Sequence, residues 1–147
     1  ISYDKYRKRY PTSLRFVEKT SLDTVIEQSD IISLHLPLTD ETKYMVDRSF
    51  FDKVKKGVII SNTSRGQIIE TEALLDALKS GKVGGACLDV FENEKPDHFS
   101  NPEKEMYGQL YKMENVVLTP HIAGWTHESL QQIAEVLFAK IKAGNHL

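Results

Sequence analysis

Short apolar runs rich in β-branched residues alternate along the chain with longer amphipathic stretches, and this alternation limits the folds open to it. The four clearest runs are residues 31–34, 58–60, 86–88 and 116–118. Runs that are apolar at nearly every position are typical of strands covered on both faces, as in parallel sheets. Strands and helices that alternate along the chain in this way imply right-handed βαβ crossovers between parallel strands. The sequence therefore predicts an α/β fold with a doubly wound parallel sheet.

Several segments between and after these runs have apolar residues at helical spacing. Ser21 and Asp47 precede two of them, and both residue types cap helix N-termini. Residues 71–80 carry an apolar stripe that ends before Gly81, a usual residue after a helix C-terminus. By contrast, residues 93–115 look like a long loop. The last segment is predicted to be the longest helix, with an apolar face of Leu130, Ile133, Ala134, Leu137, Phe138 and Ile141.

Composition excludes several classes of protein. The 147 residues suit one domain, and the 40% that are hydrophobic can bury a core. The 19 basic and 21 acidic residues give a net charge of −2, which leaves no strong basic field for nucleic acid. The longest apolar run, residues 136–139, is too short to span a bilayer. We therefore expect a cytoplasmic domain that binds neither nucleic acid nor a membrane.

The cysteine and histidine content argues against disulfides and metal. The single cysteine, Cys87, excludes an internal disulfide framework, and its apolar neighbours suggest an inert core residue. His121 and His127 are six residues apart, which is not the spacing of a helical metal pair. No metal site is predicted.

Polar residues follow the apolar runs, and in open α/β sheets ligands bind beyond the carboxyl ends of the strands. An arginine pairs a carboxylate through a planar fork, and a histidine exchanges a proton near neutral pH. A nearby carboxylate favours the protonated imidazole. Arg65, Glu94 and His121 together suit a substrate that has a carboxylate beside a carbonyl or hydroxyl. The residues at the strand ends are Asp4, His35, Pro37, Asn62, Thr63, Ser64, Arg65, Gly66, Asp89, Glu94, Thr119 and His121.

Each of these residues also has an ordinary structural interpretation. Arg65 could be a surface residue at a turn, and Asp89 could cap the next turn. Glu94 alone would be a solvated loop carboxylate, and for the neighbouring Glu92 that interpretation is preferred. By residue type alone, His121 has four rivals: His35, His98, His127 and His146.

Three segments resemble the signature segments of the D-isomer-specific 2-hydroxyacid dehydrogenases. They are residues 62–66 (Asn-Thr-Ser-Arg-Gly), 86–94 (Ala-Cys-Leu-Asp-Val-Phe-Glu-Asn-Glu) and 119–124 (Thr-Pro-His-Ile-Ala-Gly). The resemblance runs from residue 1 to about residue 143, in the family's order and spacing. It implies a Rossmann-like domain of an oxidoreductase that transfers a hydride between NAD(H) and a D-2-hydroxy acid or 2-keto acid. An NAD-sensing corepressor of the same fold is the alternative.

The resemblance also implies a role for individual residues. Arg65 would hold the substrate's carboxylate and carbonyl, His121 would be the acid/base, and Glu94 would keep His121 protonated when a ketone is reduced. Asp4 would accept from the adenosine ribose hydroxyls, which favours NAD over NADP, although the basic residues within 5–9 would suit a 2′-phosphate. The further implied cofactor contacts are His35, Pro37, Thr63, Ser64, Arg65, Asp89 (at the nicotinamide carboxamide), His121 and Gly124.

Two features depart from the family pattern. The GxGxxG turn that should precede Asp4 is absent, and so is the substrate domain. The resemblance therefore implies that residues 1–147 are the C-terminal portion of an NAD-binding domain, truncated at its first βα unit and inactive alone. The intact protein is expected to be a homodimer. A further departure is local: Trp125 follows Gly124 where the family usually has a small residue, and the loop of residues 93–115 is long. Both could alter or cover the substrate pocket.

Overall fold

A sheet of four parallel strands forms the centre of the computed structural model, which describes residues 1–7 and 9–144. The strands follow one another across the sheet in chain order, and Ile60 on the second strand lies between Ile32 and Ala86 on its two neighbours. This arrangement confirms the predicted parallel α/β sheet. The strands are β1 (Ile31–Leu34), β2 (Val58–Asn62), β3 (Val83–Leu88) and β4 (Val116–Leu118).

Two helices begin directly after the capping residues that the sequence indicates, because a capping residue acts locally. The Ser21 hydroxyl accepts a hydrogen bond from the Thr24 amide, and the Asp47 carboxylate accepts one from the Phe50 amide. Gly81 follows the third helix with a φ of 71°, a conformation that favours glycine. The described helices are α1 (Leu22–Gln28), α2 (Arg48–Lys53), α3 (Thr71–Lys79), α4 (Asn101–Leu110) and α5 (His127–Lys142), with 3₁₀ turns η1 (Thr12–Leu14), η2 (Gly66–Ile68) and η3 (Pro96–His98).

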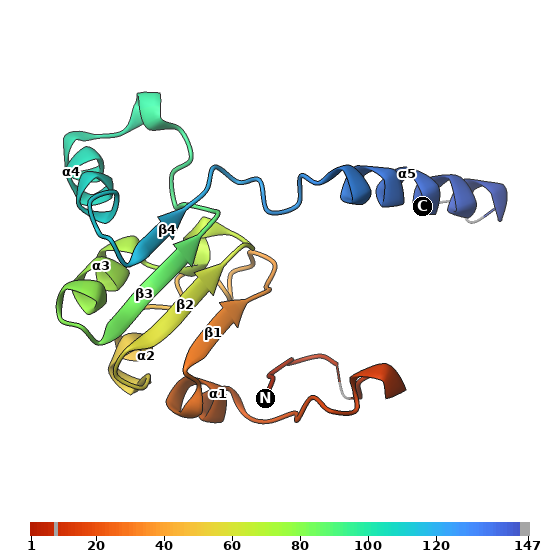
Figure 1. Ribbon diagram of the computed structural model, residues 1–147, viewed down its shortest axis with the longest axis horizontal. Coiled ribbons are helices and arrows are strands. Elements are labelled where there is room, and N and C mark those ends of the chain that lie inside the picture. Colours follow the sequence, from red (N-terminus) through yellow and green to blue (C-terminus); the bar gives the residue numbers. More distant parts are fainter. Residues whose placement is uncertain (8, 145–147) are drawn as a thin grey trace.

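One face of the sheet is covered and the other is open in the described part of the chain. Right-handed crossovers between strands added in one direction place their helices on the same face, and α2 and α3 pass behind the sheet in Figure 1. On β1, Ile32 is buried whereas Ile31 is 66% exposed. The expectation that both faces are covered is therefore not met within the described residues. Cys87 is exposed on β3, so its interpretation as a core residue is wrong.

The hydrophobic core lies between the covered face of the sheet and the helices. α3 contributes its predicted apolar stripe, and α4 packs beside it. The most completely buried large side chains are Tyr107, Ile60, Ile68, Leu74, Leu110, Val46, Val58 and Val83.

Residues 93–115 form an ordered structure and not the long loop that was expected. They contain η3 and α4, and α4 begins with a capping box in which Ser100 and Glu103 bond each other's backbone amides. Tyr107 and Leu110 anchor α4 in the core. The segment therefore lies beside α3 as part of the folded domain.

The two ends of the described chain lie apart from the sheet. Asp4 was placed at a strand end, but the residues before it form only an isolated parallel bridge, between Ser2 and Lys19. The predicted helix α5 is confirmed, but it extends away from the sheet (Figure 1). All of its residues are described and none is buried; Phe138 is 68% exposed. Among the described residues, no helix is long and apolar enough to cross a membrane.

Candidate active site

Asn62 ends β2 and shapes the turn that carries Arg65. The buried Asn62 amide oxygen accepts from the Ser64 amide (3.0 Å) and hydroxyl (2.8 Å), and its nitrogen donates to the Arg65 carbonyl (2.9 Å). The Arg65 guanidinium donates to the Ser64 carbonyl at 2.6 Å and is exposed. The turn is therefore fixed by a buried side chain while the guanidinium stays accessible to a ligand.

Asp89 follows β3 directly and shapes a second turn, the one that carries His121. Its buried carboxylate accepts from the Thr119 hydroxyl (2.6 Å) and from the Ile122 and Ala123 amides (both 2.9 Å). Burial acts to raise the pKa of Asp89, but these three hydrogen bonds outweigh it and hold the pKa below its ordinary value. The structural interpretation supposed that Asp89 caps the next turn along the chain. Its side chain instead organises the distant turn at residues 119–123.

His121 has an unusual backbone conformation within this turn. Its φ is 56°, and among the described residues only Tyr44 is another non-glycine residue with a positive φ. Side chains disfavour this left-handed region by roughly 1–2 kcal/mol. The hydrogen bonds that Asp89 accepts on either side of His121 oppose that cost.

Glu94 contacts His121 across the two loops that follow β3 and β4. Glu94 Oε2 lies 3.0 Å from His121 Nδ1, and Glu94 Oε1 accepts from the Phe91 amide at 3.3 Å. The two side chains are 41% and 48% exposed. Because an ionised carboxylate only accepts hydrogen bonds, the contact favours a hydrogen on Nδ1 and leaves Nε2 for a ligand.

The Arg65 turn and the loop that leads to Glu94 touch through their backbones. A Cβ atom on Gly66 would lie 1.9 Å from the carbonyl carbon and oxygen of Phe91. The close approach therefore requires glycine at this position. The structure brings the three predicted catalytic residues to the carboxyl ends of the adjacent strands β2, β3 and β4.

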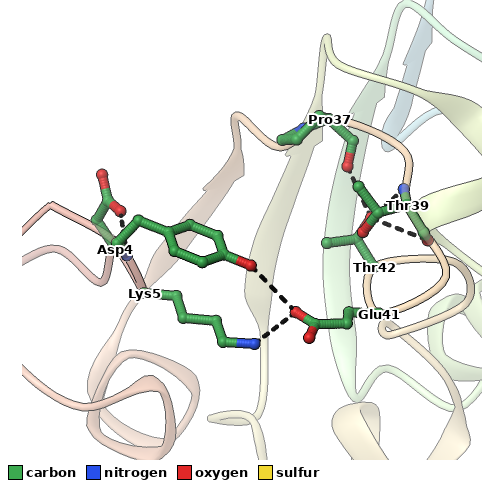
Figure 2. A network of polar contacts seen from close by, with 7 residues as sticks. Asp4, Lys5, Pro37, Thr39, Glu41 and Thr42 are labelled. Carbon is green, nitrogen blue, oxygen red and sulfur yellow. Dashed lines mark hydrogen bonds and ion pairs between the residues drawn. The ribbon is translucent and has the colours of Figure 1, made fainter.

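Most of the predicted cofactor residues come directly after strands, at the carboxyl edge of the sheet, but Asp4 does not. Asp4 lies outside the sheet, where its Oδ1 accepts from the Arg7 and Tyr6 amides, and these bonds lower its pKa. Figure 2 shows that Lys5 extends from the same segment to Glu41, with its Nζ 2.5 Å from Oε2. The other predicted contacts follow β1 (His35, Pro37), β2 (Thr63, Ser64, Arg65), β3 (Asp89) and β4 (His121, Gly124).

Sequence reasoning missed the residues that support the site. Glu92 is not a solvated carboxylate, because its Oε1 accepts from the Thr71 amide at the start of α3. Asn93 donates from its side chain to Glu103 at 2.9 Å. The spacing of Ser100 and Glu103, a capping-box signature, was the signal that could have revealed this part of the chain.

Three further expectations can be placed. No cluster of three histidine, cysteine, aspartate or glutamate side chains able to hold a metal occurs within residues 1–7 and 9–144. Trp125 is 80% exposed. Lys8 of the basic run and the rival His146 lie outside the described residues.

Comparison with known proteins places the chain in a family. A sequence model of the D-isomer specific 2-hydroxyacid dehydrogenase NAD binding domain matches residues 1–123. The glyoxylate reductase of Thermofilum pendens is 46% identical over 122 residues, which are 82% of this chain and 33% of that protein. The hydroxypyruvate reductase of Thermotoga maritima is 41% identical over 141 residues, 96% of this chain and 43% of that protein.

Solved structures agree with the sequence comparison. The NAD-complexed D-isomer specific 2-hydroxyacid dehydrogenase of Lactobacillus delbrueckii ssp. bulgaricus matches with a TM-score of 0.80 and 34% identity, over 99% of this chain and 46% of that one. The D-lactate dehydrogenase of Aquifex aeolicus, complexed with NAD and lactic acid, matches with a TM-score of 0.79 and 34% identity, over 97% and 46%.

The chain spans less than half the length of each of these relatives. They are reductases and dehydrogenases, and so give no support to the corepressor alternative. The match over residues 1–123 and these likenesses show that the chain belongs to the D-isomer specific 2-hydroxyacid dehydrogenase family, and that it corresponds to the NAD-binding domain of that family.

Proposed function

We propose that this chain supplies the NAD-binding and proton-transfer part of an oxidoreductase that interconverts a D-2-hydroxy acid and a 2-keto acid. The observation that carries the proposal is the 3.0 Å contact between Glu94 Oε2 and His121 Nδ1. A histidine oriented by a carboxylate through one ring nitrogen presents the other nitrogen as an acid or base. The accessible arginine on the adjacent strand end is the natural partner for a substrate carboxylate.

The proton chemistry follows from these three side chains. In reduction, His121 Nε2 gives its proton to the carbonyl oxygen of the substrate; in oxidation, it takes the proton of the hydroxyl. Glu94 stabilises the imidazolium form through Nδ1. Arg65 binds the carboxylate in two parallel hydrogen bonds and polarises the carbonyl. A positioned acid/base of this kind contributes typically about 10²–10⁴-fold to the rate.

The residues present fit a nicotinamide dinucleotide. The carboxylate of Asp4 is partly exposed and its lowered pKa keeps it ionised, as an acceptor for ribose hydroxyls must be. Asp89 Oδ2 accepts one hydrogen bond, from Ala123, and a carboxylate oxygen has room for a second, from an amide such as the carboxamide. A Cβ on Gly124 would meet nothing within 4 Å, so its backbone is open to a ligand. When bound, the cofactor supplies the hydride exchange with the substrate carbon.

Two basic side chains near Asp4, those of Lys5 and Lys19, already have partners, which supports NAD over NADP. Lys5 pairs with Glu41, and the Lys19 ammonium donates to the Arg7 carbonyl. The negative charge on Asp4 would repel a 2′-phosphate at short range. We therefore assign NAD to the adenosine side of the site.

The proposal concerns an intact protein in which this chain would be the C-terminal portion of the NAD-binding domain. The sequence itself contains no GxGxxG turn. We infer a cytoplasmic homodimer that acts on a small 2-hydroxy or 2-keto acid and binds neither nucleic acid nor a membrane. The net charge of −2 supports the exclusion of nucleic acid, and the exposed apolar face of α5 supports burial against another protein surface.

A chimera tests the activity directly. This chain would replace the 141 matching residues of the Thermotoga maritima hydroxypyruvate reductase, and turnover of glyoxylate, hydroxypyruvate and pyruvate with NADH would be measured. We expect turnover that falls by at least about 10² with His121→Asn, whereas the control His127→Asn, an exposed histidine on α5, leaves it unchanged. NADH binding without turnover of any keto acid would overturn the proposal in favour of a sensor.

A further inference from the structure

We propose that α4 is the positioning element for Glu94 and that Asn93 is the joint through which it acts. Tyr107 and Glu103 on α4 would hold Asn93, and Asn93 would hold the backbone on both sides of Glu94. The inference rests on the proposed function, which gives Glu94 its role beside His121. It concerns three residues to which that proposal assigns nothing.

Asn93 makes three hydrogen bonds close to Glu94, through its amide and both polar atoms of its side chain. Its amide donates to the Tyr107 hydroxyl (3.2 Å), and its side-chain nitrogen donates to Glu103 Oε1 (2.9 Å). Its side-chain oxygen accepts from the Lys95 amide at 3.0 Å. This last bond closes an Asx turn in which Glu94 is the enclosed residue. The backbone is thus tied immediately before and immediately after Glu94.

Tyr107 makes the first of these ties rigid. Its side chain is 2% exposed, and its ring stacks on Phe99 with centroids 4.7 Å apart. The ring of Phe91 meets it edge-on at 6.0 Å. A hydroxyl on a ring packed in this way has a fixed position. The Asn93 amide is therefore attached to the hydrophobic core.

Glu103 sets the orientation of the Asn93 side chain. One Glu103 oxygen accepts from the Ser100 amide (2.8 Å) and hydroxyl (2.6 Å), and the other accepts from Asn93. The hydrogen bonds from the Ser100 side chain, the Asn93 side chain and the Ser100 backbone lower the pKa of Glu103 to about 2. An ionised carboxylate accepts only, so it selects the amide rotamer that points nitrogen at Glu103 and oxygen at Lys95.

These ties matter for the contact between Glu94 and His121, which tolerates little movement. The His121 side of the contact is fixed by Asp89, whereas Glu94 is 41% exposed and lies in a loop. A shift of about 0.6 Å or more would take the 3.0 Å separation beyond a hydrogen bond. The ties through Asn93 supply the restraint that an exposed loop residue would otherwise lack.

The test reads the tautomer of His121 in this chain by ¹⁵N NMR of the neutral imidazole, and so needs no turnover. We expect hydrogen on Nδ1 in the wild type and a shift toward the Nε2 form in Glu94→Ala, because the acceptor is then gone. Asn93→Asp keeps the oxygen that faces Lys95 but places a second carboxylate against Glu103. We expect it to lower the ratio of Nδ1–H to Nε2–H about fivefold, the equivalent of one hydrogen bond.

A reciprocal change should rescue the defect. In Asn93→Asp/Glu103→Gln the direction of the side-chain hydrogen bond is reversed, with Gln donating to Asp, while Gln still serves a capping box. We expect this double variant to recover most of the wild-type ratio. Tyr107→Phe should lower the ratio as Asn93→Asp does. Asn93 is partly exposed, so its variants keep the test decisive if Tyr107→Phe fails to fold.

A control separates positioning from general loss of structure. Tyr111→Phe changes an exposed tyrosine at the end of α4 that takes no part in the hydrogen bonds of Asn93 and Glu103. It should leave the His121 ratio unchanged. If Glu94→Ala lowers the ratio but Asn93→Asp does not, or if the double variant shows no rescue, the positioning role is wrong and the proposed function stands. If Glu94→Ala has no effect, the Glu94–His121 pair itself fails and both proposals fall.

Discussion

Two aspartates are proposed to hold opposite ends of one cofactor, yet the fold secures them in opposite ways. Asp89 is buried at the end of β3, and its three hydrogen bonds come from Thr119, Ile122 and Ala123 in another part of the sequence. Asp4 lies outside the sheet, and its hydrogen bonds come from Tyr6 and Arg7, which follow it directly. The first is held by tertiary structure and the second by its own turn.

The difference shows how the site is organised within this chain. At the proposed nicotinamide end, buried residues such as Asn62 and Asp89 hold the turns that carry the exposed catalytic side chains, so disturbing these supports disturbs the fold. At the adenosine end, the segment around Asp4 is joined to the loop after β1 by the exposed ion pair between Lys5 and Glu41, worth at most about 1 kcal/mol (Figure 2). The end at Asp89 is therefore preorganised by the fold, whereas the end at Asp4 is held by hydrogen bonds within its own segment and by an exposed ion pair.

The largest expected effect concerns the chain alone. We expect no keto-acid-dependent oxidation of NADH by the 147-residue chain and at best weak NADH binding, because no glycine-rich turn presents amides to the pyrophosphate. The chimera described above, assayed at equal concentration, is the matched comparison. Micromolar binding with clear turnover by the chain alone would show that the adenosine end is organised after all.

Gly66→Ala disturbs the preorganised end, in the turn that carries Arg65. The added Cβ would overlap the Phe91 carbonyl at 1.9 Å, and both atoms of that group belong to the backbone. We expect a loss of about 3 kcal/mol in the free energy of unfolding, measured in urea. The control is Gly108→Ala in α4, where the new Cβ meets nothing within 4 Å and should stabilise by up to about 1 kcal/mol. Equal stability of the two variants would contradict the close contact.

Exchanging each aspartate for asparagine compares the two ends directly. Asp89→Asn leaves a single oxygen to accept the hydrogen bonds that two oxygens now accept, so we expect a loss of about 2 kcal/mol in unfolding free energy. Asp4→Asn should change it by no more than about 0.5 kcal/mol. A larger loss at Asp4 would mean that the N-terminal segment stabilises the domain more than its contacts indicate.

Asp4→Ala should alter cofactor choice without altering the fold. In the chimera we expect NAD to bind at least about tenfold more weakly, since hydrogen bonds to a charged acceptor are lost. NADP should weaken less, because the repulsion of its 2′-phosphate disappears as well. The two dissociation constants can be compared by nucleotide fluorescence. A wild-type preference for NADP would show that the basic residues near Asp4 outweigh its charge.

Acid should gradually lower the stability that Glu103 contributes beside the proposed nicotinamide end. Glu103 has a pKa of about 2 in the folded chain against an ordinary value of 4.5, so the unfolded chain binds its proton first as the pH falls. Its contribution to stability is complete above 4.5 and is lost as the pH drops toward about 2. Glu103→Gln should flatten this part of the curve of unfolding midpoint against pH. Ser100→Ala removes one of the bonds to Glu103 and should move the loss to higher pH.

The sequence predicted the elements that local rules control. Ser21, Asp47 and Gly81 mark helix ends because each acts on the backbone within a few residues of itself. The apolar runs mark β1 to β4 because β-branched residues suit strands. Arg65, Glu94 and His121 were singled out by the motifs that contain them, and their catalytic roles stay a prediction.

The parts that failed depend on partners distant in sequence. An apolar run does not reveal whether one face or two will be covered, so Cys87 and Ile31 were misplaced. α4 escaped notice because it places few large apolar side chains in the core and contains Gly108. The support that Glu92 gives to Thr71, and that Glu103 gives to Asn93, joins residues that only the folded chain brings together.

The left-handed backbone of His121 bears on how the site should be disabled experimentally. Alanine is the customary inactivating replacement, but at a φ of 56° it removes the imidazole and retains a side chain that disfavours the conformation. Asparagine tolerates that region better and glycine adopts it freely. A loss of activity in His121→Ala would therefore have two causes that cannot be separated: the missing proton carrier and a relaxed turn between Thr119 and Ala123. His121→Asn separates the two, which makes it the cleaner inactive version for trapping a bound substrate.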